Sequence, residues 1–546
     1  MVMTEKQNQL SQQEQMVRGA AWLTIGNFLS RLLGAIYIIP WYAWMGRFGA
    51  QANALFGMGY NIYALFLLVS TVGIPVAVAK QVAKYNTKNQ KDTSFYLIRE
   101  FLKLMLLLGA IFALAMYVFS PLMAAWSGGG EDLVRVMRSL TLAVLVFPAM
   151  SVLRGFFQGF NNLKPYAVSQ IAEQLIRVIW MLLTAFYIMK LGSGNYVEAV
   201  TQSTFAAFIG MLASIAVLIY FLWKEKMLSR VFSKKPDHVT VDTKSLVIET
   251  TKEAIPFVVT GSAVQIFQII DQWTFSNTMS LFTNYSKASL DIMFAYFAAN
   301  PNKLTMILIA VATAVSGTGI PLLTENFVKK DKKAAAHLVI NNIQMLTMFL
   351  LPAILGSVIL AKPLYTIFYG QSDQLALNLF IAALIQTLFL AFYTLFSPML
   401  QALFENRKAL IYFAYGLIVK LVLQIPCIYL LQAYGPLLAT AVGLLVPIVL
   451  SYKQIHKVTS FSQTIVFRSN LLIAILTLLM GLVVALVTWG LGLVLSPDGR
   501  INSMIYILLV GTVGVAFYGY LTLKTRLLDK MLGSRAAALR KTFRIS

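Results

Sequence analysis

The chain has 546 residues, of which 58% are hydrophobic and 12% are charged, and its mean hydropathy is +0.73. Soluble domains are about 25% charged, so this composition predicts a protein that crosses a membrane many times. The net charge of +23 would suit nucleic-acid binding if the basic residues formed one surface, but their distribution along the chain argues against that interpretation.

A helix that spans a bilayer needs about 20 mostly apolar residues. After a polar, glutamine-rich segment at 1–17, fourteen segments meet this requirement. They cover residues 20–45, 53–80, 97–126, 133–157, 166–190, 198–223, 250–280, 290–324, 337–361, 374–402, 409–431, 436–452, 470–495 and 503–523. An even number of spans places both termini on the same side of the membrane.

The basic residues lie mostly in the connections on the side of the termini. This side has 26 of them, against 5 on the other side, which are Arg47, Lys190, Lys287, Lys362 and Arg500. The positive-inside rule therefore predicts that both termini are cytoplasmic. Because the charge excess is a topology signal, we expect no nucleic-acid partner, and we expect anionic membrane lipids at the basic face.

The sequence contains an internal repeat. The pattern G-I-P-x6-V-x-K begins at Gly73 and again at Gly319, and a second, polar pattern recurs at nearly the same shift. Two similar membrane halves predict a carrier with one site shared between them, exposed first to one side of the membrane and then to the other. The prolines of the repeated pattern, Pro75 and Pro321, are predicted hinges.

We therefore expect an all-α polytopic membrane protein with 14 transmembrane helices, arranged as two pseudo-symmetric six-helix lobes and two additional C-terminal helices. The predicted parts are a polar cytoplasmic tail at 1–17, a first lobe at 18–223, a cytoplasmic linker at 224–249, a second lobe at 250–456, a helix pair at 466–523 and a basic cytoplasmic tail at 524–546. The helix pair is expected to face lipid because its apolar segments contain no charged residue.

The first span carries a polar face. Asn27, Ser30, Arg31 and Gly34 are spaced so that they share one side of a helix. An ionisable residue at membrane depth needs a partner, water or a function. Arg31 is either a structural arginine bonded to a neighbouring helix or an anion contact in the cavity. We favour the anion contact, with Asn27 and Ser30 in the same site, because small polar residues surround Arg31.

The fifth and eleventh spans carry further charges. Glu173 and Arg177 stand four residues apart in the order that favours an ion pair, so they either neutralise each other or contribute to substrate binding. Lys420, in the corresponding span of the second half, has no acid beside it along the helix, which favours a role in the cavity. Arg154, near the end of the fourth span, is interpreted as a structural residue that reaches the membrane edge.

Glutamines recur on one face of the seventh span, at Gln265, Gln268 and Gln272, with Asp271 beside them. Gln268 is a predicted substrate contact. Asp271 is either a counter-ion for Arg31 or Lys303 or a site of cation coupling.

The eighth span contains Asn300-Pro301-Asn302, followed by Lys303. A proline frees backbone carbonyls, which membranes tolerate only beside protein or water. Lys303 is therefore either a substrate contact beside a hinge at Pro301 or a residue at the outer start of the helix that reaches the interface. Aromatic clusters at residues 41–44 and 365–369 are interpreted as interfacial belts.

No constellation of catalytic residues stands out in the sequence. The single cysteine, Cys427, and three scattered histidines argue against a metal cluster, and no G-x4-G-K-[ST] phosphate-binding loop is present. We therefore expect a protein that is not an enzyme and has no cofactor, driven by the membrane potential or by a sodium or proton gradient.

These residues resemble a known family. Ser30-Arg31-Leu32-Leu33-Gly34 is similar to the S-R-x-L-G motif in the first span of MurJ-type lipid II flippases. The run from Arg154 to Arg177 resembles the R-G-x-x-Q-G…P…S-Q…E-Q-x-x-R pattern of the YtgP/SpoVB branch. Six, six and two spans cover essentially the whole chain, as in this branch of the multidrug/oligosaccharidyl-lipid/polysaccharide exporter (MOP) superfamily.

The resemblance implies a V-shaped pair of lobes around a cationic cavity in a bacterial cytoplasmic membrane. The implied cargo is lipid II, an undecaprenyl-pyrophosphate that carries the disaccharide-pentapeptide of peptidoglycan, with the cell-wall synthesis machinery as partner and a prenyl-tail groove at the last two spans. Arg31 matches the family motif directly. Tyr37 stands where Gram-negative members have a second arginine, a difference for which Arg177, Lys303 or Lys420 could compensate.

Other interpretations remain open at this point. A flippase for another lipid-linked oligosaccharide, such as a capsule or teichoic-acid precursor, would have the same fold. A cation-coupled multidrug exporter would have acids rather than bases dominating its cavity and would not need the last two spans. A non-transporting scaffold for cell-wall assembly would leave the buried charges without a purpose.

Overall fold

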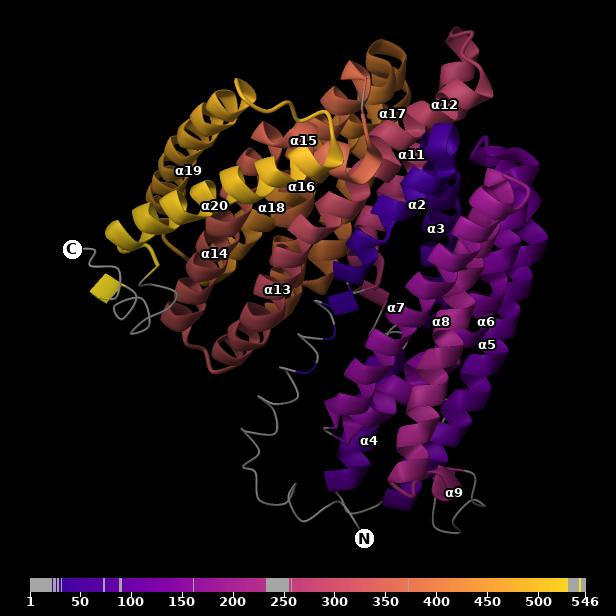
Figure 1. The fold of residues 1–546 in the computed structure, drawn as a ribbon. Coiled ribbons are helices and arrows are strands. Elements are labelled where there is room, and N and C mark those ends of the chain that lie inside the picture. Colours follow the sequence, from indigo (N-terminus) through magenta and orange to yellow (C-terminus); the bar gives the residue numbers. More distant parts are fainter. Residues whose placement is uncertain are drawn as a thin grey trace. The chain divides into compact units, whose positions relative to one another are not determined.

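The computed structural model describes residues 22, 26, 29, 30, 32–71, 74–87, 91–160, 162–231, 255, 256, 258–371, 373–528, 540 and 541. Every regular element in this part of the chain is a helix, which confirms the all-α prediction (Figure 1). The chain divides into two compact units, Met1–Trp273 and Thr274–Ser546. The boundary falls within one helix, α11 (Ala263–Phe282).

The first unit consists mostly of long helices. They are α2 (Ile38–Met45), the 3₁₀ turn η1 (Gly46–Phe48), α3 (Gly49–Thr71), α4 (Ile74–Thr87), α5 (Lys91–Trp126), α6 (Gly130–Gly159), α7 (Leu163–Phe186), the π-turn η2 (Tyr187–Leu191), α8 (Tyr196–Lys224) and α9 (Leu228–Val231), together with the first part of α11. Helix α5 packs along α6, and α7 packs along α8. Asn195 starts α8, because its side-chain oxygen accepts hydrogen bonds from the backbone of the first helical turn.

The second unit continues from α11 in the same manner. Its elements are α12 (Lys287–Phe294), the π-turn η3 (Ala295–Ala299), α13 (Asn300–Val328), α14 (Lys332–Ile359), α15 (Ala361–Tyr369), α16 (Gln374–Ala402), α17 (Asn406–Leu431), the 3₁₀ turn η4 (Gln432–Tyr434), α18 (Gly435–Thr459), α19 (Gln463–Gly492) and α20 (Arg500–Lys524). Side-chain oxygens of Ser286, Asp331, Asp373 and Ser462 cap the starts of α12, α14, α16 and α19.

The helices are consistent with fourteen spans. Eleven helical runs among the described residues are long and apolar enough to cross a membrane. Two of these runs, Leu32–Thr71 and Asn406–Thr459, each contain two predicted spans, because the 3₁₀ turns η1 and η4 join two helices without a gap. Helix α11 corresponds to the seventh predicted span.

The predicted division into lobes stays a prediction. Most of the expected linker at 224–249 lies outside the described residues, as do the N-terminal tail and most of the C-terminal tail. The first residues of the expected linker, up to Val231, belong to the end of α8, to the turn after it and to α9. In the structure the first part of α11, up to Trp273, belongs to the same compact unit as the first six predicted spans.

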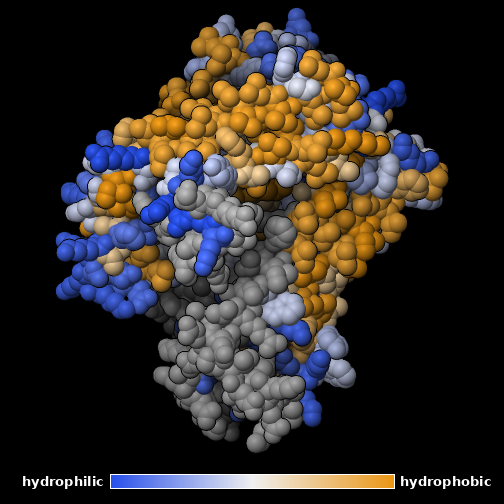
Figure 2. Space-filling view, turned by 60° about the vertical axis from the view of Figure 1, so that its left-hand side comes forward, coloured by the Kyte–Doolittle hydropathy of each residue, from blue (hydrophilic) through white to orange (hydrophobic). Residues whose placement is uncertain are grey.

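Helices α19 and α20 form a pair in the second unit. They pack on each other, α19 also packs on α14, and α20 also packs on α15 (Figure 1). Apolar side chains stay exposed along both helices, among them Leu478, Leu482 and Leu486 on α19 and Leu508 and Val515 on α20. Figure 2 shows broad hydrophobic areas on the face it draws, with hydrophilic side chains at their margins, as expected of a surface in contact with lipid.

Candidate functional site

A buried polar cluster joins three helices of the first unit. Arg154 on α6 contacts Glu173 on α7, with 2.7 Å between Nη2 and Oε2, and both side chains are mostly buried. Arg154 also donates to Ser169 on α7 at 3.1 Å and to Ser214 on α8 at 2.9 Å. The interpretation of Arg154 as a residue that reaches the membrane edge is therefore wrong: its guanidinium is held inside the bundle, where three acceptors satisfy it.

Arg177, one helical turn beyond Glu173, has a different environment. Its guanidinium lies 5.4 Å from the ring centroid of Tyr60 on α3, and the ring of Tyr63 lies edge-on to that of Tyr60. Glu173 acts on Arg177 electrostatically, but its ion pair within 4 Å is with Arg154. The expected Glu173–Arg177 pair is replaced in this way because a neighbouring helix brings a second guanidinium to the carboxylate. Arg177 is left to an aromatic site that links α7 to α3.

The first span runs along α7. A Cβ atom on Gly26 would lie 3.3 Å from the Cβ of Ala167, and one on Gly34 would lie 3.4 Å from the side-chain nitrogen of Gln174. From Gly26 to Gly34 along the span, the contact moves in the same direction along α7, from Ala167 to Gln174, so the two helices run parallel. Ser30 is half-buried on this span. Asn27 and Arg31 lie outside the described residues, and their predicted roles stay predictions.

Lys420 is fully buried between α17 and α18. Its ammonium donates to the backbone carbonyl of Pro436 at 3.1 Å and to the hydroxyl of Thr440 at 2.6 Å, two groups one turn apart on α18. One turn further along α17, Gln424 donates to Thr274 on α11 at 2.8 Å. Lys420 thus faces α18 in this structure, and a role in substrate binding remains a prediction.

The glutamine face of α11 binds α3. Gln272, which is fully buried, donates to the carbonyl of Met58 at 3.2 Å and to Ser127 at 2.9 Å, and it accepts from Asn61 at 3.1 Å. Gln265 donates to the Asn61 carbonyl at 2.9 Å. These amides satisfy one another at membrane depth, where an unsatisfied polar group is costly.

The remaining predicted residues of α11 lie beside this network. Gln268 is half-buried, and Asp271 is 9% exposed. Their predicted roles, a substrate contact for Gln268 and a counter-ion or coupling site for Asp271, stay predictions.

Pro301 and Lys303 belong to a continuous helical run from Lys287 to Val328. Pro301 is the second residue of α13, the helix that directly follows the π-turn η3. Lys303 is half-buried, one turn into α13. A π-turn before a proline is a local adjustment that lets a helix continue past a residue with no N–H group.

Two buried tyrosines contact the residue before this proline. The amide of Asn300 donates to the Tyr365 hydroxyl at 2.7 Å, and the Tyr369 hydroxyl donates to the Asn300 carbonyl. Trp41, from the other aromatic cluster, is buried as well and donates to Ser203 at 2.8 Å. The interpretation of these three residues as interfacial belts is wrong, because their polar atoms are bonded inside the bundle. The Asn-Pro-Asn sequence was the available signal for the site at Asn300.

The prolines of the repeated pattern both lie in described helices. Pro75 is the second residue of α4, and the two residues before this helix lie outside the described part of the chain. Pro321, in contrast, lies inside α13, which is uninterrupted around it. The glycine of the second copy allows α13 to pack closely on α14, because a Cβ atom on Gly319 would collide with the Asn342 amide. The hinge roles of Pro75, Pro301 and Pro321 stay predictions.

Comparisons with known proteins agree with this architecture. A family model described as polysaccharide biosynthesis protein matches residues 16–327. The chain is 34% identical over 535 residues to the lipid II flippase MurJ of Bacillus subtilis (strain 168), a match that covers 95% of this chain and 97% of that protein. It is also 27% identical over 163 residues to the stage V sporulation protein B of the same organism, covering 30% of this chain and 31% of that protein.

Two groups of solved structures share the fold. The inward closed conformation of a lipid II flippase MurJ has a TM-score of 0.64 at 16% identity and covers 92% of this chain and 98% of its own. An inward-facing multidrug resistance MATE transporter of the MOP superfamily has a TM-score of 0.60 at 16% identity and covers 79% and 96%. Fold, family model and full-length relative agree, and the chain belongs to the polysaccharide biosynthesis protein family, in its MurJ-type branch.

Proposed function

We propose that this protein moves lipid II from the inner to the outer leaflet of the bacterial cytoplasmic membrane. The observation that supports this proposal most is the match, over nearly the full length of both chains, to a Bacillus subtilis protein named lipid II flippase MurJ. A match that covers 95% of this chain includes at least part of the additional pair α19 and α20.

Basic residues within the predicted spans suit a cargo with a pyrophosphate group. Arg31, Arg177, Lys303 and Lys420 all lie in predicted spans, with Glu173 and Asp271 as the acids nearby in the sequence. A guanidinium binds phosphate oxygens in a bidentate manner, and a cationic cavity lowers the electrostatic cost of moving an anion through a medium of low dielectric constant. We assign the first contact to Arg31, with Ser30 and Asn27, and a supporting role to Arg177.

Alternating access is the mechanism that we propose for this transfer. Structures of MATE transporters with the same fold have been described in inward-facing and outward-facing conformations. The proline positions Pro75, Pro301 and Pro321 are the proposed bending points. A membrane potential that is negative inside favours the outward movement of the anionic headgroup by about 2.3 kcal/mol per charge per 100 mV. We therefore propose the potential as a driving force, with a sodium or proton gradient as the alternative.

The first experiment depletes the protein in its native host and measures lipid II exposed on the outer leaflet. Wild type is expected to restore exposure. Arg31→Ala is expected to fail, and Arg31→Lys to restore it in part because it keeps the charge but loses the bidentate geometry. Arg47→Ala is the matched control, since Arg47 is an exposed arginine in the turn after α2.

Three outcomes separate the proposals. Rescue by Arg31→Ala would keep the flippase and make Arg31 a structural residue. Unchanged exposure on depletion, in a host without a second flippase, would contradict lipid II as the cargo. Accumulation of a different lipid-linked glycan on the inner leaflet would then identify a capsule or teichoic-acid precursor, and its absence would favour a multidrug exporter.

A further inference from the structure

The short helix α15 lies between two parts of the second unit that are otherwise far apart in the sequence. On one side it contacts the start of α13 through Tyr365 and Tyr369. On the other side it packs on α20. Both contacts are buried or bonded, so α15 is fixed at each end rather than serving as a loose connection between α14 and α16.

The contact with α13 is made at the π-turn η3. Asn300, the first residue of α13, is fully buried and is bonded to two tyrosines, through its side chain to Tyr365 and through its carbonyl to Tyr369. Within the turn itself, the Tyr296 hydroxyl donates to Asp373, the residue that caps α16. Three hydrogen bonds from neighbouring elements therefore hold a conformation that isolated helices rarely adopt.

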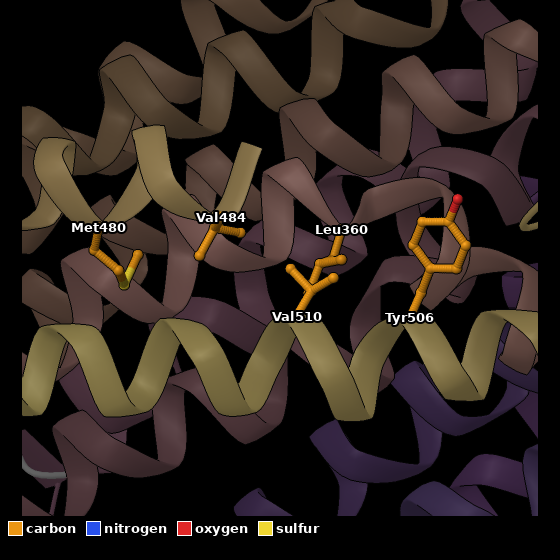
Figure 3. Close-up of a cluster of buried hydrophobic side chains, with 5 residues drawn as sticks. All are labelled: Leu360, Met480, Val484, Tyr506 and Val510. Atoms are coloured by element: carbon orange, nitrogen blue, oxygen red, sulfur yellow. The ribbon is translucent and has the colours of Figure 1, made fainter. Parts of the chain in front are cut away.

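The contact with α20 is apolar and well packed. Leu360, at the junction of α14 and α15, forms a buried cluster with Val510 and Tyr506 of α20 and with Met480 and Val484 of α19. Figure 3 shows these five side chains converging between α19 and α20. At the same end, Lys362 of α15 forms an ion pair of 2.8 Å with Asp498 in the connection between α19 and α20.

We propose that α15 couples the position of α20 to the register of the helix at η3, and that Asn300, Tyr365 and Tyr369 are positioning residues for Lys303. A π-turn accommodates one residue more than the α-helix does. Returning it to α-helical geometry would turn the preceding helix by about 100° and shift it by about 1.5 Å relative to α13. Displacement of α20 would move α15, weaken the bonds to Asn300 and change this register. The role of Lys303 rests on the proposed function, whereas the coupling does not.

Cysteine labelling tests the coupling without any cargo. In a Cys427→Ser background, which removes the native cysteine, Leu290→Cys places a reporter at a buried position of α12, and Ala288→Cys places a reference at an exposed one. Combining Tyr365→Phe with Tyr369→Phe is expected to raise the rate at which maleimide labels Leu290→Cys several-fold and to leave Ala288→Cys unchanged. Tyr520→Phe, on the exposed face of α20, is the matched control and is expected to change neither rate.

The other end of α15 supplies the second arm of the experiment. Leu360→Ala is expected to raise labelling at Leu290→Cys in the same way, because it loosens the contact with α20. Unchanged labelling in the tyrosine variants would overturn the proposal, and a response to the tyrosine variants but not to Leu360→Ala would overturn the coupling to α20. Tyr369→Phe alone, which keeps the ring packing, serves if the double variant does not fold.

Lipid II exposure in cells is measured on the same variants as a separate readout. Altered labelling with normal lipid II exposure would contradict the role assigned to Lys303 and leave the coupling intact. Normal labelling with reduced lipid II exposure would contradict the coupling and leave the role assigned to Lys303 intact.

Discussion

The ion pair between Arg154 and Glu173 makes a prediction at the scale of single residues. Arg154→Met leaves the buried Glu173 carboxylate without its partner, a change that typically destabilises a protein by about 3–5 kcal/mol. We expect a marked fall in the midpoint of thermal unfolding of the purified protein. Adding Glu173→Leu to this variant should restore most of the loss, because the unpaired charge is then removed as well.

A matched control is available at the surface. Lys329 and Glu325 form an ion pair at the end of α13, but both side chains are more than half exposed. Lys329→Met should therefore leave the midpoint almost unchanged. A similar fall for Lys329→Met and Arg154→Met would mean that burial does not distinguish the two pairs.

Lys420 makes a second prediction at this scale. A buried ammonium is costly to desolvate, so Lys420→Met should keep the protein stable to within about 1 kcal/mol. Lys420→Arg should lower the unfolding midpoint more, because a guanidinium is larger than the fully buried site beside Pro436 and Thr440, and overpacking typically costs about 1–3 kcal/mol. Thermal unfolding of both variants measures the difference.

The same two variants test the function of Lys420. Lipid II exposure that stays normal in a stable Lys420→Met variant would contradict a role of this residue in binding the cargo. A stable variant with reduced exposure would support that role.

The sequence predicted which spans contain buried charges but not how the charges pair. Spacing along one helix suggested that Glu173 pairs with Arg177, whereas the structure brings Arg154 from α6 to the carboxylate. A partner on another helix depends on where the helices cross, which periodicity within one helix cannot give. Tyr365 and Tyr369 were misjudged for a related reason: an aromatic residue with a hydroxyl group suits both a membrane interface and a buried hydrogen bond.

At the scale of helices, the contact between α7 and α8 depends on Gly210. A Cβ atom at this position would lie 2.6 Å from the backbone oxygen of Glu173 and 3.1 Å from the Cβ of Arg177. Because a backbone atom cannot move without shifting the helix, Gly210→Ala should separate α7 from α8 and lower stability by about 1–3 kcal/mol. Thermal unfolding and lipid II exposure measure the two consequences.

Gly511 in α20 provides the control for this substitution. A Cβ atom there would have no neighbour within 4 Å, so Gly511→Ala should leave stability unchanged or raise it by up to about 1 kcal/mol through higher helix propensity. If Gly210→Ala and Gly511→Ala change stability equally, helix propensity, rather than the close approach of α8 to α7, decides the outcome at Gly210.

The elements themselves were largely predictable, and their interruptions were not. Long apolar runs located the helices because the bilayer sets a minimum length. The repeated G-I-P pattern predicted a hinge at each copy, yet Pro321 lies inside the continuous helix α13. A proline is compatible with a hinge and with a continuous helix in a membrane protein, so the pattern alone does not give the local structure.

At the scale of the whole molecule, the charge distribution predicts the orientation in the membrane. The net charge of +23 is concentrated in the connections that share a side with the termini. Because Cys427 is the single cysteine of the chain, a Cys427→Ser background allows one new cysteine to be placed at a time. Thr464→Cys, at the start of α19, should face the cytoplasm, and Ser193→Cys, before α8, should face outward; both positions are exposed.

An impermeant maleimide should label Ser193→Cys in intact cells. It should label Thr464→Cys only after the cells are permeabilised. The reverse pattern would place the termini outside. This result would also bear on the mechanism, because the basic side of the protein would then face away from the leaflet in which the headgroup starts. The potential acts on the anionic headgroup as it moves outward, whichever way the protein is oriented. The labelling experiment therefore tests whether the basic face of the protein lies on the side from which the cargo enters.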